Sequence, residues 1–324
     1  MNLLVPVLLF ALGLVLLIKG GDWFVEGASG IATRFHLPDI VVGATVVSIG
    51  TTLPEVMVST TGALQGLGSM AYGNAIGSII CNTALIAAIS VAVNPGPVNV
   101  KSMKVPVIFF FSSAALYCIA AYVLGEFPRW LGFVLLTIFV VYMFLTVRNG
   151  LKNPEENEEE EGEEIKERPL WLQLVLLVGG AAVIAVGADL LVDNGTLIAE
   201  HLGVPETVIA LTFVALGTSL PELVTTITSL RKGRASLGIG NVIGANIFNL
   251  VLVSGVSVAL APFAVPQGNT LFGINSSLVL DLPLMVAVMM LLCVPALMKK
   301  KLSRWQGILL LAIYAAFCVF QFAL

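Results

Sequence analysis

The chain has 324 residues, of which 58% are hydrophobic and only 11% charged, and its mean hydropathy is +0.99. A water-soluble protein of this length needs far more charge to cover its surface, so the composition excludes a soluble globular protein. Apolar runs of about 20 residues recur along the chain, which is the length that crosses a bilayer as a helix. The sequence therefore predicts an all-α polytopic membrane protein.

Hydropathy predicts ten membrane-spanning helices. The only long polar stretch lies between the fifth and sixth of them, and it carries most of the glutamates of the chain. Residues 148–169 are therefore expected to form a solvated acidic linker, because they lack the ligand spacing and the glycine of an EF-hand loop. The predicted spans cover roughly residues 3–22, 40–61, 71–93, 105–124, 130–147, 170–191, 207–230, 237–260, 276–297 and 305–323.

The basic residues predict the orientation of these spans. Of the 16 Lys and Arg residues, all except Arg129 lie in or near loops on one side of the predicted membrane, which is also the side of the acidic linker. Cytoplasmic loops carry the excess of Lys and Arg, so both termini are expected outside the cell membrane and the linker inside. The first apolar run has no basic segment before it, and it is interpreted as a first helix instead of a signal peptide.

The reactive residues argue against catalysis and against disulfides. The four cysteines (Cys81, Cys118, Cys293 and Cys318) lie in apolar segments without metal-ligand spacing and are expected to be free. The chain has no HExxH, GxSxG or P-loop motif, and both histidines lie in predicted loops. We therefore expect no enzyme, no cofactor and no nucleic-acid partner.

The two halves of the chain repeat each other at one constant offset, which carries Glu55 onto Glu222. "SIGTTLPEV" (48–56) matches "ALGTSLPEL" (215–223), and "GNAIGSIICN" (73–82) matches "GNVIGANIFN" (240–249) without a gap. Five spans is an odd number, so the second half would cross the membrane in the opposite sense. The sequence predicts two inverted five-helix repeats, residues 1–147 and 170–324, joined by the linker 148–169. Secondary transporters with this design bind their substrate at the midplane between the repeats.

Each repeat places one carboxylate near the middle of a span, Glu55 in the first and Glu222 in the second. A charge at that depth costs roughly 2.5–3.5 kcal/mol on insertion scales, so it needs a partner. No Lys or Arg lies at a similar depth in any predicted span. The missing positive charge must therefore come from a proton or from a metal cation.

The neighbours of these carboxylates favour a metal cation. Thr51 is four residues before Glu55, so both lie on one helix face, and Pro54 cannot donate a backbone hydrogen bond, which frees carbonyl groups in the preceding turn. The second motif repeats this arrangement. Hydroxyls, amides and freed carbonyls are hard oxygen donors, which suit calcium and sodium far better than zinc or copper. The candidates beyond the carboxylates are Thr51, Thr218, Ser78, Asn82 and Asn249, the carbonyls near Ser48 and Ala215, and, close by, Asn74 and Asn241.

These paired motifs resemble the two alpha-repeats of the cation/calcium antiporter superfamily, and within it the microbial sodium/calcium exchangers. The resemblance covers essentially the whole chain. It implies calcium and sodium as transported ions and sliding of the first and sixth helices. The predicted spans place Asp22 and Asp189 at the ends of those two helices, and a monomer in the lipid bilayer is expected. The ligands that the resemblance implies are Glu55, Glu222, Thr51, Thr52, Thr218, Ser219, Ser78, Asn82 and Asn249, with the carbonyls of Ser48 and Ala215.

Two departures from the family pattern affect the number of ions. Some members have Ser at the position of Ala245 and Asp at that of Asn249. Proton-coupled relatives often carry an extra acid or His in the third and eighth helices, and this chain has neither there. The main hypothesis is therefore a sodium/calcium antiporter. A calcium/proton antiporter is the alternative, and a channel is a third reading that would carry current without counter-transport.

Overall fold

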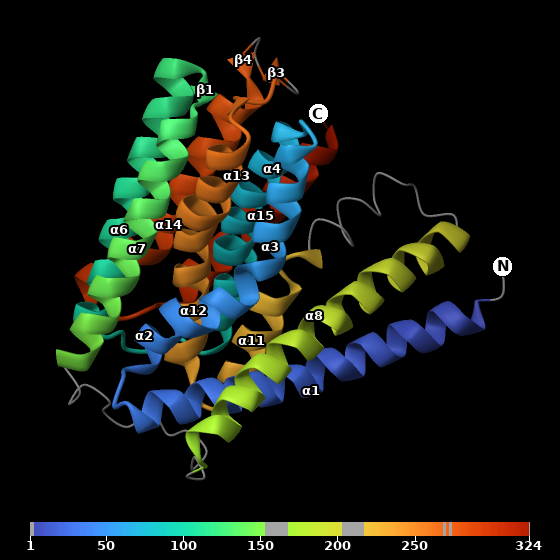
Figure 1. Ribbon diagram of the computed structural model, residues 1–324, viewed down its shortest axis with the longest axis vertical. Coiled ribbons are helices and arrows are strands. Elements are labelled where there is room, and N and C mark those ends of the chain that lie inside the picture. The colour runs from blue at the N-terminus through green and yellow to red at the C-terminus, as the bar shows by residue number, and fades with distance from the viewer. Residues whose placement is uncertain (1–2, 153–167, 203–216, 268–269, 272–273, 324) are drawn as a thin grey trace.

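Helices make up nearly all of the computed structural model, which describes residues 3–152, 168–202, 217–267, 270–271 and 274–323 (Figure 1). The α-helices are α1 (Leu4–Arg34), α2 (Asp39–Val42), α3 (Ser48–Leu64), α4 (Gly68–Cys81), α5 (Ala88–Val93), α6 (Val100–Ile119), α7 (Arg129–Lys152), α8 (Leu170–His201), α11 (Leu220–Arg231), α12 (Ala235–Phe248), α13 (Ser254–Leu260), α14 (Leu282–Lys299) and α15 (Arg304–Ala323).

Short π-helical and β segments interrupt or join these helices. The π-helices are η1 (Gly43–Val47), η2 (Asn82–Ala87), η3 (Ala120–Leu124), η6 (Asn249–Val253) and η7 (Ser277–Asp281). The two-residue strands are β1 (Glu126–Phe127), β2 (Phe263–Ala264), β3 (Thr270–Leu271) and β4 (Ile274–Asn275), with β1 antiparallel to β2 and β3 antiparallel to β4.

The fold is that of a helical polytopic membrane protein, as the composition predicts. Within the described residues, eight helices are long and apolar enough to cross a membrane, and α15 is a shorter apolar helix. The predicted span 207–230 is described only in its second part, where α11 lies, because residues 203–216 are outside the described ranges. Most of the acidic linker also lies outside them. The four cysteines are free, as expected.

The first and sixth spans are longer than hydropathy predicts. Helix α1 continues to Arg34, so Asp22, expected at a helix end, and Lys19, expected in a loop region, both lie inside it. Asp189 likewise lies inside α8, which extends to His201. The reason is that residues 23–34 contain no proline, so nothing stops the helix until His36 takes a left-handed backbone with φ 51°. A polar residue lowers hydropathy, but it does not end a helix.

Helices α1 and α8 form an antiparallel pair that crosses the other helices at a steep angle (Figure 1). Gly13 packs against the backbone of Gly187, and Gly20 packs against that of Gly180. Residue numbers therefore increase along α1 in the direction in which they decrease along α8, as they must in an antiparallel pair. A Cβ atom at Gly27 would lie 2.6 Å from the carbonyl oxygen of Gln173. Small residues repeated along one helix face let membrane helices approach this closely.

Several contacts between the two halves of the chain occur in matched pairs. The Arg129 guanidinium donates a hydrogen bond to the Leu260 carbonyl at 3.1 Å, and that of Arg304 donates to the Val93 carbonyl at 3.5 Å. Arg129 and Arg304 occupy equivalent places in the repeated "RW" motif, and the offset that relates Glu55 to Glu222 also relates Val93 to Leu260. A contact that recurs with its two partners exchanged is the mark of a two-fold relation. The backbone contacts of Gly132 with Ala259 and of Gly307 with Ala92 follow the same rule.

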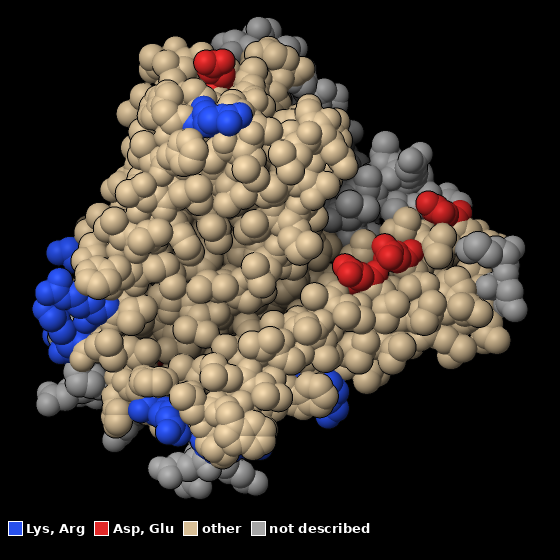
Figure 2. All heavy atoms as spheres, in the orientation of Figure 1, with Lys and Arg blue, Asp and Glu red and all other residues tan. Residues whose placement is uncertain are grey.

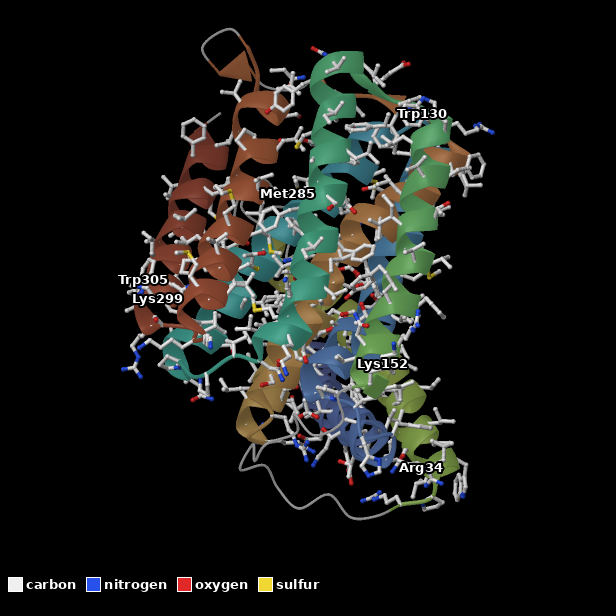
Figure 3. The ribbon with its side chains drawn as sticks, turned by 90° about the vertical axis from the view of Figure 1, so that its left-hand side faces the viewer. Arg34, Trp130, Lys152, Met285, Lys299 and Trp305 are labelled. Carbon is white, nitrogen blue, oxygen red and sulfur yellow. The ribbon has the colours of Figure 1, made fainter. Side chains whose placement is uncertain are left out.

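Much of the surface carries no charge. Figure 2 shows a broad uncharged band on this face, with Lys and Arg along its left and lower edges and near the top, and with Asp and Glu on the right and at the top. In Figure 3, Lys152 and Arg34 lie toward the lower end and Trp130 lies near the upper end. Tryptophan is typical of membrane–water interfaces, and the uncharged band between is the surface that lipid would cover.

We predict that Gly180→Ala destabilises the protein by about 1–3 kcal/mol, because overpacking a tight contact forces the helices apart. The added Cβ would lie 2.5 Å from the Phe24 backbone nitrogen. Gly179→Ala is the matched control, since a Cβ there meets nothing within 4 Å. Thermal unfolding of the purified variants measures the difference. Equal stability of the two variants would show that α1 and α8 are not closely packed.

Candidate cation-binding site

Three of the predicted ligands lie in or directly after π-helical turns. Helix α3 follows η1 directly, so Ser48 is its first residue after the π turn. Segments η2 and η6 begin at Asn82 and Asn249, which are equivalent positions in the repeat. A π turn breaks the regular backbone hydrogen-bond pattern and is frequent at functional sites. These turns were not predicted from the sequence.

Side-chain hydroxyls take up the carbonyl groups that the first π turn leaves exposed. Tyr142 of α7 is wholly buried, and its hydroxyl donates to the Ala44 carbonyl at 2.8 Å. The Ser48 hydroxyl lies 2.8 Å from the Gly43 carbonyl oxygen, five residues earlier. Ser254, the first residue of α13, donates its hydroxyl in the same way to the carbonyl of Asn249, the first residue of η6, at 3.1 Å. The π turns are therefore supported by specific side chains.

Nearly all of the predicted site residues are buried in the protein interior. Glu55 and Glu222, from α3 and α11, have no exposed surface. Thr218 is partly buried, and Ala215 lies outside the described residues. The other predicted ligands are buried to at least nine-tenths: Ser48, Thr51, Thr52, Ser78, Asn82, Ser219 and Asn249.

Many of these buried oxygens have no hydrogen-bond partner among the described residues. Neither carboxylate oxygen of Glu55 or of Glu222 accepts a hydrogen bond of standard geometry from that part of the chain, and neither residue forms an ion pair there. A buried polar group without a partner costs about 1–3 kcal/mol, and an ionised carboxylate costs more. The same holds for Thr52, Ser219, Asn82 and Asn249. Unpaired donors and acceptors on this scale indicate a ligand site.

The structure brings residues from the two halves of the chain together. Glu55 and Glu222 lie close enough to interact electrostatically, and the hydroxyls of Thr51 and Thr52 lie within electrostatic reach of the Glu222 carboxylate. Residues that are far apart in the sequence thus form one cluster, as the repeat predicts. Two like charges at this depth repel each other, which increases the need for a positive partner.

Two asparagines bridge the halves next to this cluster. The Thr51 hydroxyl donates to the Asn241 side-chain oxygen at 3.2 Å, and the Thr218 hydroxyl donates to the Asn74 side-chain oxygen at 3.2 Å. Ser48 also contacts Asn241, with its hydroxyl 2.9 Å from the backbone carbonyl oxygen. The sequence places Asn74 and Asn241 near the site, and the structure shows which side chains they contact.

Three residues near the site were missed by sequence reasoning. Asn246 is wholly buried, and its amide nitrogen donates to the Thr83 hydroxyl at 2.7 Å while its side-chain oxygen has no partner among the described residues. Thr225, one turn after Glu222, is also buried and unpaired in that part of the chain. The Cys81 thiol lies within electrostatic reach of Glu222. Asn246 precedes Asn249 by three positions on one helix face, a signal that a search limited to matched positions overlooks.

The donor chemistry suits a hard cation. The cluster offers two carboxylates together with hydroxyl and amide oxygens, and the described residues contain no group of three or more His, Cys, Asp or Glu of the kind that holds zinc. Calcium takes six to eight oxygen ligands in flexible geometry, from carboxylates, carbonyls and amides. The residues present fit such an ion, which would be a substrate of the protein instead of a resident cofactor.

Fold and site together define a multi-pass integral membrane protein with two buried acids in its interior. The chain matches the family described as "Sodium/calcium exchanger protein" over residues 5–148 and 172–323. It is 31% identical to the sodium/calcium exchanger MaX1 of Methanosarcina acetivorans over 356 residues, covering 97% of this chain and 98% of that relative. It is 34% identical to the inner membrane protein YrbG of Escherichia coli over 275 residues, covering 80% of this chain and 81% of that protein.

A solved structure of the sodium-calcium exchanger NCX_Mj, soaked with Na+ and Sr2+, superimposes with a TM-score of 0.80 at 34% identity, covering 97% of this chain and 98% of that one. The chain belongs to the sodium/calcium exchanger family. It is accordingly a cation/calcium antiporter of the membrane and not an enzyme. The resemblance carried by the two repeated motifs is thereby confirmed.

We predict that Tyr142→Phe lowers the free energy of unfolding by about 1–2 kcal/mol, because the buried Ala44 carbonyl loses its hydrogen bond. Tyr117→Phe is the matched control, since Tyr117 is equally buried and its hydroxyl makes no hydrogen bond of standard geometry within the described residues. Thermal unfolding in calcium-free buffer compares the two. A larger loss in Tyr117→Phe would contradict the role assigned to Tyr142 in supporting the π turn.

Proposed function

We propose that this protein exchanges calcium for sodium across the cell membrane by alternating access. The cations bind between the two halves of the chain, near the middle of the membrane. The proposed ligands are Glu55, Glu222, Thr51, Thr52, Thr218, Ser219, Ser78, Asn82 and Asn249, with the backbone carbonyls of Ser48 and Ala215.

The observation that carries this proposal is that the carboxylates of Glu55 and Glu222 are wholly buried and form no ion pair with a Lys or Arg of the described residues. Their combined charge of two can neutralise one divalent ion, or two monovalent ions with help from neutral oxygens. An exchanger requires this property, because one site must bind each of the exchanged ions in turn. A permanently bound structural ion would satisfy the charge equally, but the family is one of transporters.

Sodium is the proposed driving ion because the site holds few groups that could carry protons. The buried polar residues of α12 and η6 are the neutral amides Asn241, Asn246 and Asn249. Among the described site residues only Glu55 and Glu222 are acids, and no histidine lies beside them. A calcium/proton antiporter remains the second candidate, with one of these glutamates as the proton carrier.

Alternating access is proposed from the relation between the halves. The matched contacts of Arg129 and Arg304, and of Gly13 with Gly187 and Gly20 with Gly180, support two inverted repeats joined by the linker 148–169. Helices α1 and α8 lie against the site helices, with the Phe24 ring against Gly50. We propose that this pair moves relative to the other helices and exposes the site to each side in turn.

Orientation is proposed from the positions of the basic residues along the sequence. All Lys and Arg residues except Arg129 fall in or near the predicted loops on the side of the linker, so we propose that this side is cytoplasmic and that both termini are outside. One chain supplies both halves of the proposed site, so we propose that the monomer transports.

Glu55→Gln and Glu222→Gln are each predicted to abolish calcium exchange in vesicles while the protein still folds. Each change removes half of the negative charge but keeps the shape of the side chain. Calcium should stabilise the wild type against thermal unfolding, by about 2.7 kcal/mol at a hundred times the dissociation constant, and should not stabilise either variant. Glu126→Gln is the control, because Glu126 is an exposed acid in β1. Wild-type exchange in either site variant would overturn the proposed site.

The driving ion is identified by calcium flux into vesicles under imposed gradients of sodium, potassium and protons, applied one at a time. Sodium-dependent uptake is the expected result. Uptake driven by a pH gradient without sodium would instead assign the protein as a calcium/proton antiporter. Calcium current with no gradient of a second ion would identify a channel.

A further inference from the structure

The two bridging hydrogen bonds of the site are copies of each other. Thr51 donates to Asn241, and Thr218 donates to Asn74, both at 3.2 Å. The offset between the two threonines is the same as that between the two asparagines. One bond runs from Thr51 of α3 to Asn241 of α12, and the other runs from Thr218, in the turn before α11, to Asn74 of α4. The same contact therefore occurs twice, with the halves exchanged.

The direction of these bonds matters for cation binding. A threonine hydroxyl has one proton and two lone pairs, and a cation can bind only to a lone pair. If the proton points at the cation, the hydroxyl repels it. The Thr51 hydroxyl has two acceptors of standard geometry, the Asn241 side-chain oxygen at 3.2 Å and the Ser48 carbonyl oxygen at 3.5 Å, and the shorter contact is the one to the amide. For Thr218 the acceptor is the Asn74 side-chain oxygen. This geometry directs both protons at the amides. The lone pairs of both hydroxyls are then left for other partners.

The Asn74 amide is held so that its oxygen can act as this acceptor. Its nitrogen donates to the Ser59 hydroxyl at 2.8 Å and to the Glu55 carbonyl at 3.2 Å. Both acceptors belong to α3, the helix that carries Glu55. With the nitrogen engaged on α3, the oxygen is directed at Thr218 of the other half.

Asn241 reaches its partners because the backbones of α12 and η1 approach closely. A Cβ at Gly43 would lie 2.7 Å from the Asn241 backbone nitrogen, so the glycine is required there. The Asn241 side-chain oxygen accepts from Thr51, and it also lies 3.3 Å from the Ser48 hydroxyl. Its oxygen thus faces two of the proposed ligand residues.

We propose that Asn74 and Asn241 are positioning residues, each of which orients the threonine hydroxyl of the opposite half so that its lone pairs face the transported cation. The amide of one repeat prepares a ligand of the other. This inference rests on the proposed function, and it adds two residues that act on calcium affinity through Thr218 and Thr51.

A pair of double-mutant cycles tests the proposal. Asn241→Leu removes the acceptor at similar volume, and Thr51→Val removes the hydroxyl at similar shape. Calcium binding to the purified full-length protein in sodium-free buffer is measured by titration calorimetry, with the Michaelis constant for calcium in vesicle exchange beside it. Asn74→Leu and Thr218→Val form the second cycle.

Each single variant is expected to weaken calcium binding by about three- to tenfold, the scale of one hydrogen bond. The matched double variants combine each threonine change with the change of its own asparagine. They should bind calcium about as tightly as the single variant that binds calcium less tightly, because without the hydroxyl there is nothing for the amide to orient. The crossed pairs are the control: Thr51→Val with Asn74→Leu, and Thr218→Val with Asn241→Leu. Their losses should multiply.

Multiplying losses in the matched pairs would overturn the proposal, because the asparagines would then act independently of the threonines. Should a leucine variant fail to fold, Asn→Ala variants replace it, with Thr51→Ser as a second background. Serine keeps the hydroxyl, so removing the Asn241 amide in the Thr51→Ser background should weaken calcium binding as much as it does in the wild type. A loss as small as that in the Thr51→Val background would contradict the proposal. A wild-type protein that neither binds nor exchanges calcium would overturn the proposed function itself, whereas absent coupling in an active wild type overturns only this inference.

Discussion

The burial of two carboxylates inside a helical membrane protein is the constraint on which the rest of the structure depends. Glu55 and Glu222 have no exposed surface, and within the described residues neither has a cationic partner or a hydrogen bond of standard geometry to its oxygens. Protein alone cannot satisfy such groups at low dielectric, whereas a cation can. Unpaired oxygens, π turns and closely packed helices lie around the two carboxylates, which is the arrangement that the proposed cation site needs.

Close packing between the halves depends on glycine at a few positions. Gly43 lets α12 approach η1 so that Asn241 can contact Thr51, and Gly50 lets the Phe24 ring of α1 lie against the helix that carries Glu55. In lipid there is no hydrophobic force between helices, so such contacts and the hydrogen bonds between halves hold the site together. A Cβ at Gly43 would lie 2.7 Å from the Asn241 backbone nitrogen, so a side chain there would push α12 away from η1.

Most of the fold, and the proximity of Glu55 and Glu222, could be predicted from the sequence, for physical reasons. Hydropathy reports apolar length, and the constant, gapless offset between the repeated motifs is enough to pair Glu55 with Glu222. The end of α1 was predicted wrongly, because Asp22 lowers hydropathy without breaking a helix. The π turns and the hydroxyl of Tyr142 depend on contacts between distant segments, which no local pattern reports. Asn246 was missed because it has no polar counterpart in the first half.

The two halves share their sequence pattern but differ in conformation, and alternating access requires such a difference. Related halves in identical conformations would open the site equally to both sides, so each end state must hold them in different arrangements. The two asparagines show such a difference between the halves. The Asn74 amide nitrogen donates to the Ser59 hydroxyl, whereas the Asn241 amide nitrogen has no partner among the described residues. Thr226, equivalent to Ser59, also has an unpaired hydroxyl in that part of the chain. Under the proposed mechanism, the opposite-facing state exchanges these roles, so that Asn241 engages Thr226 while Asn74 releases Ser59.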